Sequence, residues 1–435
     1  MKIAVLGGGL TGLTAAHHLS GHNHEVTLFE SNDLLGGLAS GFKGEGWDWY
    51  LERAYHHIFS SDQDILSLAK VVGFEGFSFK EPVTAAMYEV THPSPRLRGA
   101  SNYRTYSVDT PQDFLSFPLL TYPEKIRVGL VVAFLKLSPF FSLYEKQTAE
   151  KFLRSSMGDR VWDVLWEELF RKKFGKKAGN ILASFIWARI KKRTKSLGYP
   201  EGGFQTFINF VAKKNKDRGV TIKTQTIVDR ITKSGRGFEV YDSGKKKGTF
   251  FDVVISTLPT PVFLTVLGGE LPAPYRKQLS QIKYLNAVNL ILETEQPFFK
   301  KEYWINMCDK KAPMMVLVQH TNFIDKKHYD NKHILYCANY VEKEHSLWTM
   351  SQEEIIKYHL PYIRKITNNK GDIFQAHLFK APFAQPLFDR EFPARMPHFE
   401  TPIKNLFIAN LDMTYPYDRG TNYAVKLGKE VASLV

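Results

Sequence analysis

The first 30 residues restrict what this chain can fold into more than any other stretch. An apolar run at 2–6 leads directly into the sequence Gly-Gly-Gly-Leu-Thr-Gly at 7–12. An Ala-rich segment and a second apolar run at 26–29 follow, ending in Glu30. This order predicts a strand, a glycine turn, a helix and a second strand. A βαβ unit of this kind is the frame that holds a dinucleotide.

Each glycine of the turn has a separate task in that frame. Gly7 permits the tight turn, Gly9 lets the backbone approach a pyrophosphate, and Gly12 lets the helix pack on the strand. The helix N-terminus then presents free N–H groups and a partial positive charge to the phosphates. Glu30 stands 18 residues after Gly12, where a carboxylate can bind ribose hydroxyls. Together these features predict a dinucleotide site.

A glycine pair, Gly36-Gly37, follows six residues after Glu30. Here the chain resembles the FAD enzymes of the amine oxidase, protoporphyrinogen oxidase and phytoene desaturase superfamily, to which UDP-galactopyranose mutase is related. In that superfamily the pair lets the chain run close beside the ribityl phosphate. The basic residue that usually precedes the pair is replaced by Leu35. The resemblance implies FAD as the cofactor.

Two further blocks extend the resemblance over most of the chain. The sequence Gly-Tyr-Pro-Glu-Gly-Gly at 198–203 is similar to the superfamily's YPxGG segment. Val228 matches the valine whose backbone meets the adenine. The runs at 238–241 and 249–256 flank a loop of Gly and Lys residues and predict a hairpin. Residues 252–259 resemble the strand that returns to the cofactor.

The last block closes the chain with an apolar strand at 405–410 and a final helix. In the superfamily this strand ends in Gly-Asp or Gly-Glu. Here Asn410 and Leu411 stand in that place, and Asp412 is the substitute acid one residue on. The resemblance implies that the N-terminus of the final helix faces the N1–C2 carbonyl edge of the flavin, where its dipole favours the anionic reduced ring.

The resemblance therefore implies a set of residues around a non-covalent FAD, since no Cys or His attachment motif lies near the three blocks. The predicted cofactor-binding residues are Gly7, Gly9, Leu10, Thr11, Gly12, Glu30, Ser31, Gly36, Gly37, Leu38, Val228, Thr257, Asn410, Asp412, Gly420, Thr421, Asn422 and Tyr423.

The spacing of the blocks predicts the domain organisation. They lie at the start, middle and end of 435 residues, so one domain is expected to be discontinuous. We predict an α/β fold whose Rossmann-like FAD-binding domain, a parallel sheet plus a β-meander, takes residues 1–85, 198–262 and 385–435. Residues 86–197 and 263–384 are expected to form a second, α+β substrate or cap domain.

The net charge of +14 comes largely from basic runs at 171–177 and 189–195. We interpret these runs as solvated helix faces. Alternatively, their positive charge would attract an anionic membrane surface, a carboxylated substrate or a sugar nucleotide. No nucleic-acid module is recognisable, so nucleic acid is not an expected partner. The apolar stretch Val128–Phe141 is too interrupted to span a bilayer. A buried cap helix is the first interpretation, and interfacial membrane contact is the alternative.

The pattern fixes no catalytic residue, but His56 and His57 are candidates. In the superfamily the chain passes here along the isoalloxazine face, where a His can contact the ring or protonate a substrate. A hydrogen-bonded core His is the alternative for both positions. The aromatic candidates for an apolar substrate chamber are Trp304, Tyr340, Phe383 and Tyr415.

Cysteine and histidine give no metal-ligand spacing, so no metal is expected. The chain has two cysteines, Cys308 and Cys337. We interpret the histidines at 17, 18, 22 and 24 as solvated surface. Because the sequence starts directly with the strand and its glycine turn, we expect no signal peptide. We expect a reduced, cytoplasmic environment, and a peripheral position on the membrane is the alternative.

A second glycine fingerprint is missing from the sequence, so no dedicated NAD(P)H site is expected. The leading hypothesis is an FAD-dependent oxidase or dehydrogenase that transfers a hydride to flavin N5 from a small-molecule substrate, either an amine or a lipophilic, including anionic, compound. The second is a redox-neutral flavoenzyme acting on a sugar nucleotide, as in the mutase branch. The third is a flavin-binding protein that acts mainly as a membrane or protein partner.

Overall fold

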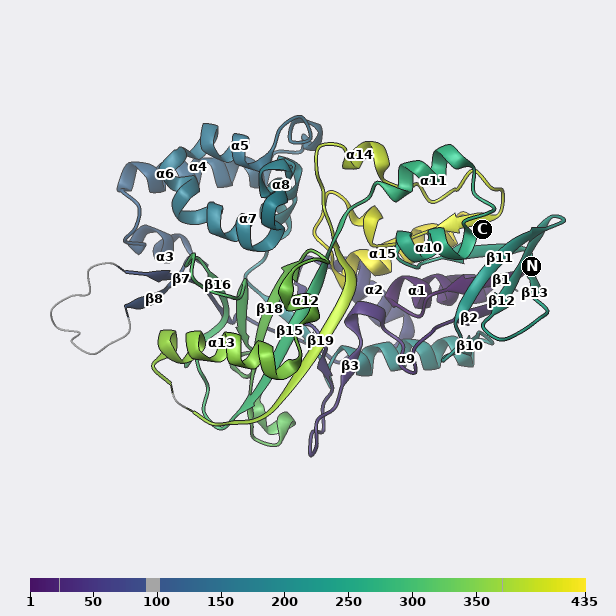
Figure 1. Ribbon diagram of the computed structural model, residues 1–435, viewed down its shortest axis with the longest axis horizontal. Helices are drawn as coiled ribbons and strands as arrows, with labels where there is room; N and C mark the ends of the chain where they lie inside the picture. The colour runs from purple at the N-terminus through teal and green to yellow at the C-terminus, as the bar shows by residue number, and fades with distance from the viewer. Residues whose placement is uncertain (23, 91–101, 370) are drawn as a thin grey trace.

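The first sheet is built from five parallel strands. The computed structural model describes residues 1–22, 24–90, 102–369 and 371–435 (Figure 1). Neighbouring strands are parallel throughout this sheet. Ile3, Ala4 and Val5 of the central strand are fully buried, which explains why its sequence is a continuous apolar run. In spatial order the strands are β10 (Thr221–Lys223), β2 (Glu25–Phe29), β1 (Lys2–Leu6), β14 (Val253–Ser256) and β20 (Leu406–Ile408).

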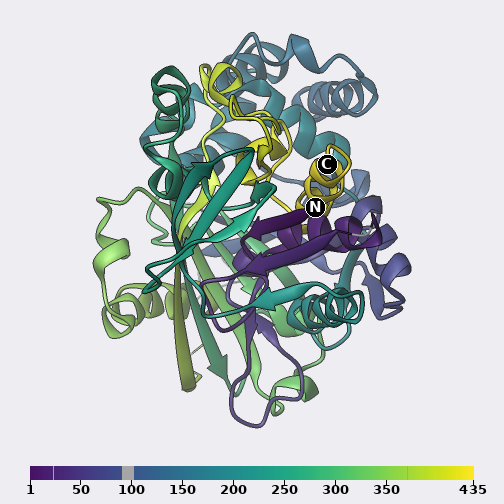
Figure 2. The same ribbon diagram turned by 90° about the vertical axis from the view of Figure 1, so that its right-hand side faces the viewer.

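Helices beside this sheet bring the two ends of the chain together. The helix after the glycine turn, α1, contacts both α9 and α15, and α2 packs on α15. A Cβ at Gly428 would lie 2.4 Å from Thr11 O, so the contact of α15 with α1 requires glycine there. The N- and C-termini consequently lie side by side (Figure 2). The helices of this half are α1 (Leu10–Leu19), α2 (Gln63–Val72), α9 (Phe204–Asp217), α10 (Thr260–Leu267), α11 (Ala273–Ser280), α14 (Phe392–Arg395) and α15 (Thr421–Ala432).

The predicted hairpin is present within a three-stranded antiparallel meander, β11 (Val228–Ser234), β12 (Gly237–Asp242) and β13 (Thr249–Phe251). The run at 249–256 is not one strand, however. At Asp252 the chain changes sheets, because Oδ2 accepts a hydrogen bond from Lys2 N at 2.7 Å while Asp252 N donates to Lys2 O at 2.8 Å. These bonds place the following β14 parallel to β1.

A larger, seven-stranded sheet forms the other half of the molecule. Its neighbouring strands are antiparallel, apart from the parallel pair β16 and β7. Helices α12 (Ser346–Thr349) and α13 (Gln352–Thr367) pack against it. In spatial order the strands are β19 (Ile373–Pro386), β15 (Tyr284–Thr294), β18 (His333–Val341), β17 (Val316–Gln319), β16 (Glu302–Met307), β7 (Val83–Glu89) and β8 (Tyr103–Ser107).

Short strands form two further sheets in the described part of the chain. One pairs β3 (Gly41–Phe42) with β4 (Leu51–Glu52), and the other places β9 (Leu197–Pro200) between β5 (Ile58–Phe59) and β6 (Phe77–Lys80).

A layer of helices, residues 111–195, lies beside the seven-stranded sheet (Figure 1, top left). We call it the helical layer. A π-helical turn, Trp162–Trp166, separates its fourth and fifth helices. Its helices are α3 (Pro111–Ser116), α4 (Tyr122–Leu137), α5 (Ala149–Met157), α6 (Asp159–Val161), α7 (Glu167–Phe174) and α8 (Ala183–Lys192).

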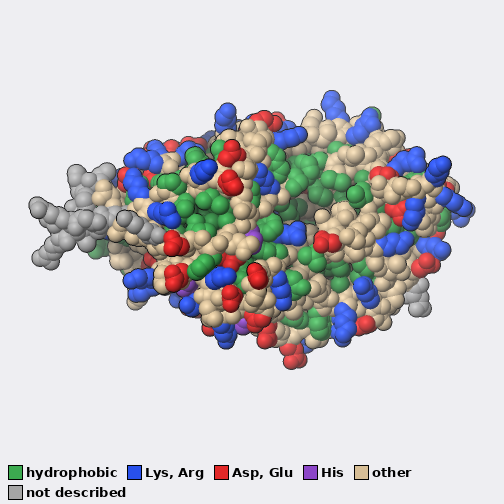
Figure 3. Space-filling view, turned by 60° about the horizontal axis from the view of Figure 1, so that its bottom comes forward, with side chains coloured by type: hydrophobic (Ala, Val, Ile, Leu, Met, Phe, Trp, Pro, Cys, Tyr) green, Lys and Arg blue, Asp and Glu red, His purple; other side chains and the backbone are tan. Residues whose placement is uncertain are grey.

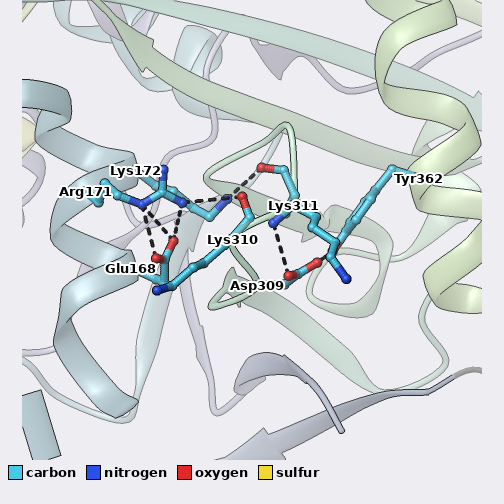
Figure 4. Close-up of polar contacts among 8 residues, drawn as sticks. Glu168, Arg171, Lys172, Asp309, Lys310, Lys311 and Tyr362 are labelled. Atoms are coloured by element: carbon cyan, nitrogen blue, oxygen red, sulfur yellow. Dashed lines mark hydrogen bonds and ion pairs between the residues drawn. The ribbon is translucent and has the colours of Figure 1, made fainter. Parts of the chain in front are cut away.

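Polar contacts fix α7 to the loop that follows β16 (Figure 4). Lys172 Nζ donates to Ala312 O at 2.6 Å, and Arg171, which pairs with Glu168, donates to Lys310 O. On the other side of the same loop, the carboxylate of Asp309 accepts hydrogen bonds from Lys311 N and from Tyr362 OH of α13. The helical layer and α13 are therefore joined through one loop.

The stretch Val128–Phe141 is not a buried cap helix, as we first interpreted it. Most of it belongs to α4, which packs on α3, α5 and α8. Val128 and Leu135 are buried, but Leu130 and Phe134 are 68% and 58% exposed. Among the described residues, no helix is long and apolar enough to cross a membrane.

Two further surface interpretations need correction. His17 is buried, and its Nδ1 lies 2.9 Å from Asn215 Oδ1, because the packing of α1 on α9 encloses it.

Lys and Arg side chains are spread over the face shown in Figure 3, as expected for solvated charge. Lys173 is an exception, since only 15% of its side chain is exposed and it pairs with Asp418.

Candidate flavin site

The glycine turn between β1 and α1 leaves open the space that a pyrophosphate would need. A Cβ built on Gly9 meets no atom within 4 Å, whereas a Cβ on Gly12 would lie 2.0 Å from Gly7 O. Gly7 has φ +104°, a conformation that side chains rarely adopt. The Thr257 hydroxyl supports the turn from β14 by donating to Leu6 O at 2.8 Å. Gly12 is therefore required by the fold itself, but Gly9 is not.

The predicted glycine pair lies directly beside this turn. Gly36 N donates to Gly8 O at 2.8 Å, and Gly9 and Gly36 form an isolated parallel bridge. Both glycines of the pair have positive φ, +120° for Gly36 and +56° for Gly37. Two segments that are separate in sequence thus lie side by side, with Gly36 buried and Gly37 exposed.

Glu30 is buried at the end of β2 and is held in one position. Its Oε2 accepts a hydrogen bond from Gly8 N at 2.8 Å, and its Oε1 accepts one from Asn32 N at 2.9 Å. The segment that leads to Val228 also lies beside Glu30, because Thr226 N donates to Glu30 O at 2.8 Å. Val228 follows two residues later at the start of β11. The turn, the acid and the valine segment are therefore neighbours.

Asp412 occupies a buried polar pocket after β20. Its Oδ2 accepts hydrogen bonds from Thr260 Oγ1 at 2.5 Å and from Tyr284 OH at 2.6 Å. Burial raises the pKa of this carboxyl to about 6, against the opposing effect of these hydrogen bonds. Asn410 accepts from Asp412 N at 3.1 Å and donates to Leu258 O. Oδ1 of Asp412 has no partner among the described residues.

Several predicted residues use their side chains within the fold. Leu10 is 3% exposed in the core, so it presents only backbone at the start of α1. Asn422 caps α2, since Oδ1 accepts from Ile65 N at 3.1 Å. Tyr423 stacks on Tyr417 with ring centroids 4.8 Å apart. The remaining members are Thr11 inside α1, Ser31 and Leu38 exposed on the surface, and Gly420 and Thr421 at the start of α15. Direct contact of these residues with FAD stays a prediction.

His56 and His57 lie between the two halves of the molecule. His56 Nδ1 is 2.6 Å from Ala54 O, and His57 Nδ1 is 3.3 Å from the hydroxyl of Tyr303 on β16. Burial lowers the pKa of His56 to about 4 and that of His57 to about 3, and nearby guanidinium groups lower both further. Both rings are therefore neutral at pH 7. The predicted chamber residue Trp304 packs edge-on against Tyr55 at 4.7 Å.

A charged cluster next to these histidines was missed in the sequence. Asp418 Oδ2 accepts from Lys173 Nζ at 2.6 Å and from Arg189 Nη1 at 3.0 Å. Arg419 stacks over the ring of Tyr340 at 4.9 Å, and no carboxylate among the described residues lies within ion-pair distance of it. We call Lys173, Arg189, Asp418 and Arg419 the cationic cluster. The signal available in the sequence was Asp418-Arg419 directly before the last helix.

Burial and opposite charge set the ionisation of the cationic cluster. Burial lowers the pKa of Lys173 to about 8, although Asp418 opposes the shift. Burial alone would raise the pKa of Asp418, but Lys173 and Arg189 outweigh it and hold the pKa below its usual range. At pH 7 the cluster therefore has three positive charges against one negative charge. Of the chamber candidates, Tyr340 lies at this cluster and Trp304 packs on Tyr55 and His57. Phe383 packs instead on Tyr284, and Tyr415 on Phe388.

The residues present fit FAD. The open space at Gly9, the neighbouring backbone of Gly36 and Gly37, and the N-terminus of α1 provide a place for a pyrophosphate. Glu30 lies beside that place, and the start of α15 lies next to Arg419 at the other end. The arrangement is that of a flavoprotein of the Rossmann-like class.

Comparison with known proteins agrees with this class. Residues 10–435 match the family of flavin containing amine oxidoreductases. The chain therefore belongs to the flavin-containing amine oxidoreductase family and is an FAD-dependent oxidoreductase. The resemblance noted in the sequence is confirmed.

Individual relatives are distant. The 15-cis-phytoene desaturase of Synechococcus elongatus is 22% identical over 320 residues, which cover 67% of this chain and 65% of that enzyme. The match thus spans slightly less than two thirds of the desaturase. A protein assigned as a protoporphyrinogen oxidase from Exiguobacterium sp. 255-15 is similar in structure, with TM-score 0.75, 18% identity and coverage of 100% and 98% of the two chains. Cyclohexylamine oxidase from Brevibacterium oxydans has TM-score 0.73 and 13% identity, with coverage of 100% and 98%. The predicted α/β fold is confirmed by these structures.

Proposed function

We propose that this chain is an oxidase or dehydrogenase that removes a hydride from a lipophilic, anionic substrate and holds its FAD without a covalent bond. When bound, FAD supplies the hydride acceptor at N5. The two cysteines support the non-covalent part, because burial raises the pKa of the Cys308 thiol to about 12 and that of Cys337 still further. Both remain protonated thiols, which are poor nucleophiles for attachment.

The cationic cluster is the single observation that carries the substrate assignment. Three cations face one carboxylate, and the guanidinium of Arg419 stacks on the ring of Tyr340 without an ion pair to any carboxylate of the described residues. A protonated amine entering beside this cluster would meet a repulsive field, whereas a carboxylate or phosphate would be attracted. The planar guanidinium of Arg419 suits two-point binding of such a group.

The chain's other residues fit a lipophilic reacting carbon. Tyr55 keeps its proton, because burial raises its pKa to about 12, and His56 and His57 are neutral. None of the three thus adds charge where the substrate C–H would lie. Tyr55 and Trp304 present aromatic surface that excludes water. In this scheme Arg419 and Arg189 bind and orient the acidic group, and the aromatic side chains hold the apolar part.

The same cluster also favours a second candidate function. A sugar nucleotide has a pyrophosphate that the cations of Arg419, Arg189 and Lys173 would bind equally well. The reaction would then be redox-neutral and would require flavin reduced beforehand.

Anaerobic flavin bleaching distinguishes the candidates. Purified protein with bound FAD is mixed with porphyrinogens, carboxylated polyenes, sugar nucleotides, putrescine and cyclohexylamine, and the oxidised flavin absorbance is followed. We expect an anionic compound to bleach the flavin and the two amines to leave it oxidised. Arg419→Gln should raise the KM for the anionic compound about tenfold or more, corresponding to ~1.4 kcal/mol, whereas Arg236→Gln, in an exposed turn, should not.

Three results separate the alternatives. Rapid bleaching by the amines alone would refute the anionic assignment. Turnover of a sugar nucleotide only after prior reduction, with no net redox change, would establish the second candidate. Flavin that resists acid precipitation would contradict the non-covalent part.

A further inference from the structure

One ridge of large apolar side chains on α4 is exposed to solvent. Tyr122, Ile126, Leu130, Phe134 and Leu137 are between 58% and 79% exposed. Their spacing of four, four, four and three residues puts them on one side of the helix. Phe140 and Leu143, which are 63% and 50% exposed, continue the ridge beyond the helix end. We call these seven residues the apolar ridge.

The ridge stands on a fixed support. On the opposite side of α4, Val128 and Leu135 are buried, and Lys125 Nζ donates to Leu115 O at 2.6 Å. Arg127 donates to Ser156 O at 2.6 Å, and Lys136 Nζ donates to Arg193 O at 2.9 Å. These bonds fix the rotation of the helix, so the apolar side cannot turn inward without breaking them.

The charge of the surrounding layer indicates what covers the ridge. The helical layer, residues 111–195, has 17 Lys and Arg against 8 Asp and Glu, so it has +9 of the chain's +14. Two of these cations, Lys173 and Arg189, belong to the cationic cluster and pair with Asp418, and the layer stays strongly basic without them. Lys146 is exposed three residues after the ridge ends, and Lys151 follows it. Apolar side chains at the surface of a strongly basic layer match a bilayer whose headgroups are anionic.

We infer that the apolar ridge of α4 docks the protein on the surface of an anionic lipid bilayer. The helix lies in the interface with Leu130, Phe134 and Leu137 among the acyl chains, while exposed basic residues of the helical layer such as Lys146 and Lys151 meet the headgroups. A second copy of the chain fits less well, because two such layers would bring +9 against +9. The inference depends on the ridge and the charge alone, so it holds whichever substrate the flavin site accepts.

The test is sedimentation of the FAD-loaded protein with vesicles. Vesicles of pure phosphatidylcholine and vesicles containing phosphatidylglycerol are compared at low and high salt. We expect binding to the anionic vesicles, at least tenfold weaker binding to the neutral ones, and partial release by salt. The variant Leu130→Ser/Phe134→Ser should bind the anionic vesicles at least tenfold more weakly, with an unchanged flavin spectrum.

A matched control uses apolar residues that are equally exposed elsewhere. Tyr358 on α13 and Phe374 on β19 are 52% and 57% exposed, and Tyr358→Ser/Phe374→Ser should bind vesicles like the parent protein. Equal binding by both double variants would overturn the inference, and so would failure of the parent protein to bind anionic vesicles at low salt. A concentration-dependent dimer that the α4 variant abolishes would show instead that a second copy covers the ridge. If the flavin assignment were wrong, the spectrum would fail while vesicle binding persisted.

Discussion

Replacement of Gly9 by valine separates the needs of the fold from those of the cofactor. Gly9 has φ −70° and ψ 174°, an extended conformation that any residue adopts, and a Cβ there meets nothing within 4 Å. Gly9→Val should therefore fold. Its unfolding free energy should be equal to that of the parent or higher by about 0.4–1 kcal/mol, because the unfolded chain loses freedom.

The same variant should lose FAD. The valine side chain would occupy the space in which we place the pyrophosphate, so affinity should fall at least 100-fold, or by ~2.7 kcal/mol. The assay combines the absorbance of the purified variant, a fluorescence titration with FAD, and urea unfolding without added cofactor. We expect a colourless protein with a normal unfolding transition.

Two other glycines calibrate the result. Gly12→Ala would place a Cβ 2.0 Å from Gly7 O and should prevent folding. Gly129→Ala, also without contacts at its Cβ but on exposed α4, should keep full FAD binding and gain about 1 kcal/mol of stability. Stoichiometric FAD in Gly9→Val, or an unfolded Gly9→Val protein, would refute the reasoning.

Three further predictions concern Glu30, Glu52 and electron supply. Glu30→Ala should weaken FAD binding by about 1–3 kcal/mol in the same titration, because a buried hydrogen-bonded carboxylate is removed; an unchanged Kd would contradict its role. Burial raises the pKa of Glu52 from 4.5 to about 7, so the native state keeps a proton that the unfolded state loses. Stability should therefore fall by about 3 kcal/mol as pH rises from 4.5 to 7, and Glu52→Gln should flatten that slope in urea unfolding; an unaltered slope would argue against it. NADH and NADPH should reduce the flavin only over minutes in anaerobic stopped-flow mixing, against about 1–1000 per second for catalytic turnover; fast, saturable reduction would reveal a nicotinamide site.

Local patterns predicted the first sheet well, because each signal was contained in a short stretch. The turn at 7–12 is bounded by a buried strand and an Ala-rich helix, and backbone sterics leave few alternatives there. The division at Asp252 was missed, because it depends on a hydrogen bond to Lys2, 250 residues away. Hydrophobic pattern alone extends a strand through such a position.

Burial of polar groups could be predicted least. His17 lies near the end of α1 beside a second histidine, in a sequence that is typical of a solvent-exposed helix end. Its burial is explained only by its contact with Asn215. Lys173 belongs to a basic run in which Arg171 and Lys176 are exposed, and it is largely buried because it pairs with Asp418, far along the chain. For α4 the composition left a buried helix and interfacial membrane contact open. The exposed side chains of Leu130 and Phe134 exclude full burial, whereas membrane contact stays a proposal. Such choices depend on long-range contacts that leave no local trace.

The distribution of the parallel sheet along the chain also affects synthesis. Strand β20 and helix α15 are made from residues 406–432, yet β20 borders β14, and α15 packs on the first helix. The ribosome must therefore release nearly the entire polypeptide before the parallel sheet and the packing on α1 can be completed. Pairing over such sequence distances is slow, so nascent chains should expose the open edge of β14 for a long interval. FAD would then bind only after translation. Because the last strand of the sheet is made so late, the yield of FAD-loaded protein should depend on chaperones.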